Sequence, residues 1–278
     1  MQDYFFSINP KQESLKKHIA YYYFHFSNEK DFKKEFIYYP SFHSTLNVYK
    51  NVDIIFNEKG RVYVPKKNDE LSVIYTKGDG KSKHIRLSGK FNKIGIVFNS
   101  LGFNHFINCP FNSLITDRAV ELDYFGSSLI SVADKVYKTK DNTKKRDVLD
   151  NFFLNHLNVF KEQRLPKIID IIHDKNGAIQ IKELSNTFNI HRKTILRLFK
   201  KHLGFSYRDY TNIVKFRNAL NLYLTKKDIK LIELAYENDY YDQADFNNQF
   251  KALTNLTPKQ LFKSLKRMGH NVYWNYLD

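Results

Sequence analysis

Two stretches near the end of the chain decide its fold: IKELSNTFNIHRKTILRLFKKHLGFS at residues 181–206 and LIELAYENDYYDQADFNNQFKALTNLT at residues 231–257. The second stretch repeats, about fifty residues later, the order of acidic, apolar, turn and aromatic positions of the first. The matched pairs are Glu183 and Glu233, Leu184 and Leu234, Asn189 and Asp239, Ile195 and Phe246, Phe199 and Phe250, Lys200 and Lys251, and Ser206 and Thr257. The repeat predicts two copies of one small structural unit.

Each copy fits a helix, a tight turn and a second helix. Ser185 and Ala235 are small residues in the first helix of their copies, so the two helices of a unit can approach closely. Asn189 and Asp239 stand at the turns, where a residue that tolerates a positive φ is needed. The sequence therefore predicts two helix-turn-helix units.

A capped helix follows each unit. SYRD at 206–209 and TPKQ at 257–260 each place a hydroxyl residue at the N-cap with a polar residue three positions later. The first of these helices is expected to run from about residue 208 to 224 and to join the two units. At ~1.5 Å per residue it spans roughly 25 Å.

The segment from about residue 166 to 268 resembles the two-motif DNA-binding domain of AraC/XylS-type bacterial transcription regulators. ELSNTFNIHRKTILRLFKKHLGFS, the linker YTNIVKFRNALNLYL and ELAYENDYYDQADFNNQFKALTNLTP carry the resemblance. The sequence departs from the family at Asp239 and Asn255, where glycine is usual, and at Tyr241, where a small residue is usual. The resemblance implies that two reading helices, held a linker helix apart, meet successive major-groove faces ~34 Å apart on one side of B-DNA.

The second helix of the first unit has one apolar and one basic face. A helical wheel of residues 190–203 places an apolar stripe on one side, made of Ile195, Leu198, Phe199 and Leu203. By the resemblance, Arg192, Lys193, Leu196 and Arg197 reach base edges, with Arg197 suited to guanine O6 and N7. Thr194, Lys200 and Lys201 suit phosphate contacts. The competing interpretation is a solvated charged face without a partner.

The second reading helix has different surface chemistry. Its candidates for base contact are Gln243, Ala244, Asn247 and Asn248, and Lys251 suits a phosphate. Asn and Gln match adenine N6 and N7, but Asp242 and Asp245 make the local charge unfavourable near phosphates. We therefore expect the first unit to supply most of the affinity and the second a weaker or A·T-biased reading. Ordinary helix surface is the alternative for Asn247 and Asn248.

The rest of the chain predicts an α+β protein. Residues 1–122 read as a β-rich barrel or sandwich, of which a cupin-like barrel is one form, because short β-branched and aromatic runs alternate with turn signals. Residues 123–164 have helical spacing and fit a connector that can support dimerisation. Residues 165–270 form the double helix-turn-helix domain, and 271–278 are a tail. KIGIVFNSLGFNHFINCPFNSLITDRAVELDYFG at 93–126 resembles the end of the sensory β-domain of some family members, which implies small-molecule sensing or dimerisation without specifying a ligand.

Composition excludes several classes of protein. Of the 278 residues, 42% are hydrophobic and 16% aromatic, enough for packed domains rather than a disordered chain. Cys109 is the single cysteine, so no intramolecular disulfide and no cysteine-based zinc site can form. No signal peptide and no apolar run of ~20 residues is present, and we expect a cytoplasmic protein without a membrane partner. The net charge of +16 is shared about equally between residues 1–164 and 165–278, so it does not locate a polyanion site.

Catalytic and metal-binding patterns are missing from the sequence. It contains no G-x-S-x-G, no phosphate loop and no dinucleotide glycine pattern, so we expect neither an enzyme nor a cofactor. The histidines of the β-rich region show no HxH or HxxxH spacing, so no metal site is expected either. These histidines are His18, His25, His43, His84 and His105.

The sequence favours a sequence-specific transcription regulator that binds double-stranded DNA and positions it for RNA polymerase. A small-molecule effector or a homodimer contact in the N-terminal part would modulate it. One alternative is a ligand-binding β-domain protein whose helical part mediates protein–protein contact, and salt dependence of DNA binding separates the two. A third alternative, a cupin-like metalloenzyme, requires a bound metal.

Overall fold

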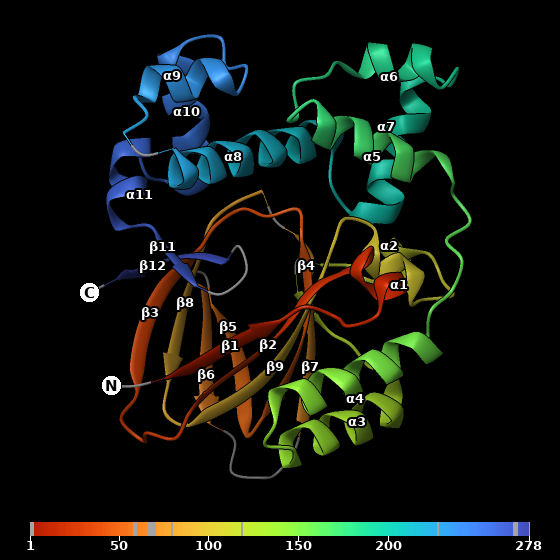
Figure 1. Ribbon diagram of the computed structural model, residues 1–278, viewed down its shortest axis with the longest axis vertical. Coiled ribbons are helices and arrows are strands. Elements are labelled where there is room, and N and C mark those ends of the chain that lie inside the picture. Colours follow the sequence, from red (N-terminus) through yellow and green to blue (C-terminus); the bar gives the residue numbers. More distant parts are fainter. Residues whose placement is uncertain are drawn as a thin grey trace.

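The computed structural model has a two-sheet β-domain, a pair of helices on one side of it and a helical C-terminal part above it (Figure 1). It describes residues 3–57, 60–65, 71–78, 80–117, 119–226, 228–268 and 272–277. The mixed α+β class predicted from the sequence is confirmed, with a β-domain of sandwich type in the N-terminal part and helices in the C-terminal part.

In the part of the β-domain that the structure describes, the strands form two sheets of six. The inner sheet runs, in spatial order, β1 (Tyr4–Ile8), β2 (Ile19–Ser27), β9 (Phe91–Phe98), β4 (Ser44–Lys50), β7 (Leu71–Thr76) and β10 (Ala119–Glu121). The outer sheet runs β11 (Lys266–Met268), β12 (Val272–Leu277), β3 (Lys33–Tyr38), β8 (Lys83–Ser88), β6 (Gly60–Pro65) and β5 (Val52–Asn57). Neighbouring strands are antiparallel except β6 and β8, which are parallel. The runs predicted as strands between residues 36 and 99 are β3 to β9.

Strand β2 explains why the inner sheet lies in the middle of the molecule. Because side chains alternate along a strand, Tyr21 and Tyr23 point into the core between the two sheets, while Tyr22 and Phe24 point into the core beneath the helices. All four are buried. A strand buried on both faces reads as a continuous apolar run rather than an alternating one, as IAYYYFHFS does.

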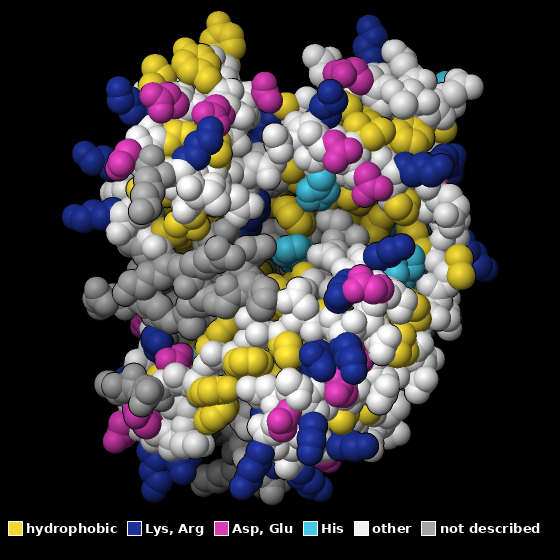
Figure 2. Space-filling model, viewed as in Figure 1, with side chains coloured by type: hydrophobic (Ala, Val, Ile, Leu, Met, Phe, Trp, Pro, Cys, Tyr) yellow, Lys and Arg dark blue, Asp and Glu magenta, His cyan; other side chains and the backbone are white. Residues whose placement is uncertain are grey.

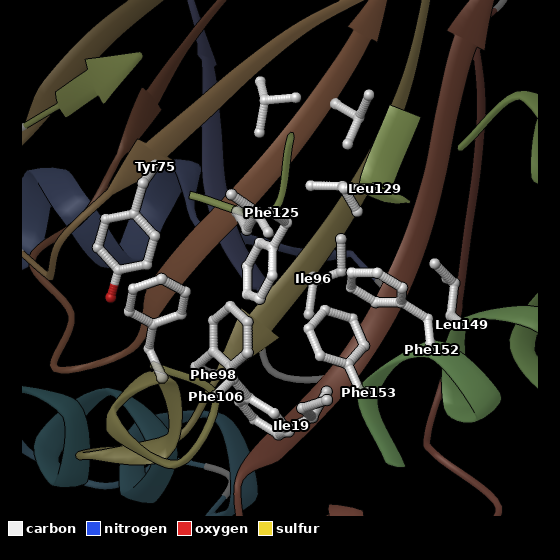
Figure 3. Close-up of a cluster of buried hydrophobic side chains, with 14 of the residues drawn as sticks. Ile19, Tyr75, Ile96, Phe98, Phe106, Phe125, Leu129, Leu149, Phe152 and Phe153 are labelled. Atoms are coloured by element: carbon white, nitrogen blue, oxygen red, sulfur yellow. The ribbon is translucent and has the colours of Figure 1, made fainter. Parts of the chain in front are cut away.

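Helices α3 (Gly126–Lys138) and α4 (Asn142–Asn155) cover the face of the inner sheet that points away from the outer sheet (Figure 1). Figure 3 shows the packing: Phe152 and Phe153 of α4 point toward Ile96 and Phe98 of β9. Aromatic edge-to-face contacts dominate, with the rings of Phe98 and Phe153 5.8 Å apart. Asp141 caps α4 by accepting from the backbone N–H groups of Thr143 and Lys144. Three short helical turns complete this layer: α1 (Glu13–Lys16), η1 (Gly102–His105) and α2 (Phe111–Leu114).

The described residues of the C-terminal part form seven helices. They are α5 (Arg164–Asp174), α6 (Ile181–Thr187), α7 (Arg192–Leu203), α8 (Tyr207–Thr225), α9 (Leu231–Glu237), α10 (Gln243–Thr254) and α11 (Pro258–Ser264). The predicted joining helix is α8, and the predicted hydroxyl caps are present: Ser206 accepts from the N–H of Asp209 and Thr257 from that of Gln260. The α5–α7 side and the α9–α11 side have separate apolar cores, and α8 contributes to both.

The helical part is docked on the β-domain rather than tethered beside it. Arg217 of α8 is buried and donates to the backbone oxygens of Pro40 (2.5 Å) and Tyr39 (3.0 Å). The Tyr39 side chain packs into the core of the second unit, and Leu101 packs into that of the first. A charged donor that satisfies two buried carbonyls gives this contact a fixed geometry.

The end of the chain returns to the β-domain. Strand β12 pairs antiparallel with β3, with Trp274 opposite Tyr38 and Leu277 opposite Glu35. Residues 272–277, which the sequence suggested only as a tail, therefore extend the outer sheet. Residues 271 and 278 lie outside the described residues.

Candidate DNA-binding site

The first helix-turn-helix unit consists of α6, a turn at Phe188–His191 and α7. Ser185 tightens it, because its hydroxyl donates to the backbone oxygen of Ile190 (2.6 Å) while its own carbonyl accepts from the Ile190 N–H (3.1 Å). Asn189 has the expected positive φ, 49°. The turn thus fixes the angle at which α7 leaves α6.

Helix α7 presents the predicted two faces. Ile195, Leu198, Phe199 and Leu203 are buried in the core of the unit. The predicted reading and phosphate residues lie on the remaining surface, all exposed except Thr194, which is half-buried: Arg192, Lys193, Thr194, Leu196, Arg197, Lys200 and Lys201. Leu196 is 46% exposed, so its side chain is available to a partner that approaches this face of α7.

The second unit, α9, its turn and α10, has the same architecture. Asp239 takes the left-handed turn position at φ 54°, and the N–H of Tyr240 bonds to the carbonyl of Ala235 (3.1 Å). Gln243, Ala244, Asn248 and Lys251 are exposed on α10, and Asn247 is half-buried. The exposed surface of α10 in the second unit therefore carries amide side chains, whereas that of α7 in the first unit carries cations.

The two acids of α10 have structural roles that the sequence did not reveal. Asp242 is the N-cap, and its side chain accepts from the N–H of Asp245 at 2.7 Å. Asp245 in turn accepts from the amide of Gln249 at 2.9 and 3.0 Å. Acids in the first turn of a helix also interact favourably with its dipole. Their presence on α10 is thus explained by helix stability.

These features agree with a comparison of the sequence with family models. A model described as a helix-turn-helix domain matches residues 184–264. This segment is an AraC-type helix-turn-helix domain. The family is one of DNA-binding transcription regulators. The match begins within α6 and ends with α11, so it includes α7, α8, α9 and α10.

Solved structures that match this chain are distant in sequence. A 1.65 Å structure of ToxT from Vibrio cholerae is 12% identical, covering 94% of this chain and 97% of that one at a TM-score of 0.44. Wild-type ToxT with a bound unsaturated fatty acid is 13% identical, covering 94% and 96% at 0.45. The C-terminal domain of AraT, a response regulator from Geobacillus stearothermophilus, is 19% identical, covering 38% and 88% at 0.35. No curated protein matches the sequence.

A cleft borders α7 on one side. It has a volume of about 840 Å³ and lies between α7, the β-domain segment 104–110 and the connector 159–164. Thr194, Arg197 and Lys201 line it. Other predicted residues of α7, including Arg192 and Lys200, do not line it. The cleft residues from outside α7 carry no pattern that links them to it in the sequence, because they lie at least 28 residues before α7 begins.

The charges of the cleft are mostly positive. Arg164 donates to both oxygens of Glu162 (2.8 and 2.7 Å), and these hydrogen bonds lower the pKa of the Glu162 carboxyl below its ordinary value. Burial, aided by the charge of Lys201, lowers the pKa of His202, so its imidazole is neutral near pH 7. Lys161, Arg197 and Lys201 form no ion pair with an acid among the described residues.

Among the described residues, the histidines of the β-domain take part in ring stacking and in hydrogen bonds within the protein. His18 and His105 stack with their ring centroids 3.8 Å apart. His25 is buried beside Asp3. Nowhere in the described residues do three His, Cys, Asp or Glu side chains gather as metal ligands would. The side chain of His84 lies outside that description. No helix among the described residues is long and apolar enough to cross a membrane.

Proposed function

We propose that this protein is a sequence-specific transcription regulator that reads the major groove with α7 and α10. The observation that carries the proposal is the surface of these two helices. Each is the second helix of its unit, each buries one apolar stripe, and each leaves side chains with base-matching chemistry in solvent. In helix-turn-helix proteins this helix enters the groove while the first helix crosses the backbone.

In the first unit, Arg197 carries the central role. It lies opposite the buried stripe, and its planar guanidinium can donate two parallel bonds to guanine O6 and N7. Arg192 and Lys193 reach neighbouring base edges, and Leu196 contacts a thymine methyl group. Thr194, Lys200 and Lys201 hold the phosphates that border the groove.

In the second unit, Asn247 and Asn248 read adenine, with Gln243 and Ala244 beside them. Lys251 contacts a phosphate. This helix adds one lysine and two structural acids, so it adds little electrostatic affinity. Its contribution is base preference, and most of the affinity comes from α7.

The N-terminal part modulates this activity through a small molecule or a homodimer contact. The docking of α8 on Tyr39 and Pro40 through Arg217 supports this role. Tyr39 and Pro40 directly follow β3, so a conformational change there would act directly on α8, the helix that joins the two helix-turn-helix units. Bound DNA is then presented to RNA polymerase. No catalytic step or cofactor enters the proposal.

A protein–protein function for the helical part remains the second candidate, and one observation favours it. Ile232 and Tyr236 of α9 and the neighbouring Tyr241 are 44%, 62% and 88% exposed. Apolar side chains grouped on one surface favour a protein partner. The first experiment therefore has to separate DNA binding from protein binding.

Selection of bound sequences from a random pool of duplexes tests the proposal directly. The full chain is used, because the helical part alone would expose the core residues that Tyr39 and Leu101 cover. We expect one motif to be enriched, and its affinity to fall steeply with salt, because binding releases the counterions that are condensed on the DNA phosphates. The double variant Lys193→Ala/Arg197→Ala should lose at least about tenfold in affinity, because one good bidentate base contact is worth ~1–3 kcal/mol. Recovery of no motif by the wild-type chain would reject the proposal.

A further inference from the structure

The cleft beside α7, called here the α7 cleft, raises the question of what its charges contact. Its walls come from three places: the β-domain segment 104–110, the connector 159–164 and α7 itself. The connector runs along the outside of the molecule from α4 to α5 (Figure 1). On the face shown in Figure 2, Lys and Arg side chains lie on both the helical part and the β-domain.

The positive charge of the α7 cleft is not used inside the protein. Arg197 and Lys201 project from α7 and Lys161 projects from the connector, and all three are exposed. None forms an ion pair with an acid among the described residues, whereas the acid in the wall, Glu162, is held by Arg164. An open site with unpaired cations on facing walls attracts a polyanion.

The position of α7 identifies this anion. A helix that lies in a major groove ~12 Å wide has a sugar–phosphate strand on each side of it. On the side of Thr194 and Lys201, the space next to α7 is the α7 cleft. One strand of any duplex read by Arg197 must therefore pass along this space.

The walls of the α7 cleft suit a strand better than an enclosed small molecule. Val159 in the connector is 84% exposed, and Asn108 and Pro110 on the opposite wall are also exposed. Small-molecule sites bury most of the ligand surface against apolar walls. Here only the floor, which includes Ile107 and Leu198, is buried, while the rim is solvent-accessible and carries the cations, which is the character of a backbone contact.

We propose that the α7 cleft receives one sugar–phosphate strand of the bound duplex, and that Lys161 contacts a phosphate across from Lys201. Arg164 acts as a positioning residue: by holding Glu162, it keeps that carboxylate from repelling the strand. The DNA interface thus extends beyond the helix-turn-helix domain onto the connector. This inference rests on the proposed function, because it assumes that α7 lies in the major groove.

The salt dependence of DNA binding tests the role of Lys161. The observed binding constant is measured for the full chain against salt, on a selected 30-base-pair duplex and on an unrelated duplex of the same length. Lys161→Gln should weaken binding to both duplexes and lower the slope of log K against log salt by about 1, the loss of one phosphate contact. Lys138→Gln, an exposed lysine at the end of α3, is the matched control and should leave the slope unchanged.

Variants of the Glu162–Arg164 pair should change binding in opposite directions. Glu162→Gln removes the carboxylate and releases Arg164, so binding should tighten and the salt slope should become steeper. Arg164→Gln frees the carboxylate in the cleft, so binding should weaken. A purely structural role of the pair would make both variants less stable without this reversal of sign. Thermal unfolding of each variant separates the two cases.

Cys109 provides an independent readout, because it lines the α7 cleft and is the single cysteine of the chain. Its rate of modification by iodoacetamide should fall when either duplex is added in excess, since the strand covers it. The inference is overturned if the slope of log K against log salt is the same for Lys161→Gln as for the control Lys138→Gln. It is also overturned if added DNA leaves the modification rate of Cys109 unchanged. If the wild-type chain selects no motif, the proposed function fails instead, and the slope on the unrelated duplex still reports on the cleft.

Discussion

Single residues set much of the response of this protein to pH, and His25 is the sharpest example. Its side chain is fully buried in β2, and Nε2 lies 2.8 Å from Asp3, which also accepts from Lys34 at 2.7 Å. Burial lowers the pKa of His25 to about 4, although the hydrogen bond to Asp3 opposes the shift. The hydrogen bonds and charges of His25 and Lys34 outweigh burial at Asp3 and hold its pKa far below the ordinary value. The cluster therefore folds with a neutral histidine and an ionised aspartate.

This cluster predicts a loss of stability in mild acid. The folded pKa of His25 lies below the unfolded value of about 6.5, so the unfolded chain binds more protons between about pH 6.5 and 4. Stability is fully present above pH 6.5 and falls as the pH drops through this window. The contribution of His25 is about 1.4 kcal/mol between pH 7.5 and 5.5. Urea unfolding at these two pH values measures it, and His25→Gln should reduce the difference by that amount. An equal difference in the variant and the wild type would contradict the assignment.

At the residue scale the sequence predicted some positions well and others not at all. Ser185, Asn189 and Asp239 were predictable because a tight helical turn requires a small residue and a positive φ at fixed places. The capping role of Asp242 has no clear signal in the sequence, because the charge of an acid beside a reading helix points equally to repulsion from phosphates. The contact of Arg217 with residues 39 and 40 has no sequence signal, since it joins residues far apart in the chain.

At the scale of elements, the two units end their reading helices with the same geometry and different residues. Gly204 follows α7 at φ 70° and Asn255 follows α10 at φ 60°. Both positions need the left-handed region, which glycine enters freely and asparagine with less strain than other residues. Unit two should therefore store more backbone strain than unit one at this cap.

Substitutions at these two caps test the difference. Asn255→Gly should leave the free energy of unfolding unchanged or raise it by up to about 1 kcal/mol, whereas Gly204→Ala should lower it by about 1 kcal/mol or more. The cost at Gly204 is mainly conformational, because an added Cβ would lie 3.4 Å from its nearest neighbours, Lys77 and Phe111. Chemical denaturation of both variants measures the changes. A loss of stability in Asn255→Gly would show that the asparagine side chain stabilises the cap.

Elements were predictable where one periodicity dominates. The buried stripe of α7 followed from the helical wheel, and the strands β3 to β9 followed from β-branched and aromatic runs between turns. The aromatic run of β2 does not by itself distinguish a strand from a helix, because both faces of the strand are buried and its apolar residues do not alternate. Strand β12 was not predicted, because its partner β3 lies at the other end of the sequence.

The whole molecule is held together by contacts between these distant segments. Hydrogen bonds join Asn104 to the backbone of His202 (3.0 Å), Tyr210 to Ser100 (2.5 Å) and Ser82 to the backbone of Leu253 (3.0 Å). Both units are thus anchored separately on the β-domain. The relative position of the two readers depends on the β-domain as well as on α8, which no local pattern in the sequence reveals.

Removal of the C-terminal strand tests this arrangement. A chain that ends after Leu265 lacks β11 and β12, so β3 becomes an edge strand with unpaired backbone groups. We expect faster hydrogen exchange of the β3 amides and self-association detectable by light scattering. A chain lacking only Asp278 is the control and should behave as the wild type. Unchanged exchange in β3 after the longer truncation would contradict the pairing.

The central claim, that α7 and α10 each read part of one DNA site, is tested most directly by repeating the sequence selection with two single variants. Arg197→Ala should lose base preference in one block of the motif. Asn248→Ala should lose it in a second block about one helical turn, ~10 base pairs, away. If both variants recover the complete wild-type motif, neither helix reads bases and the account is wrong.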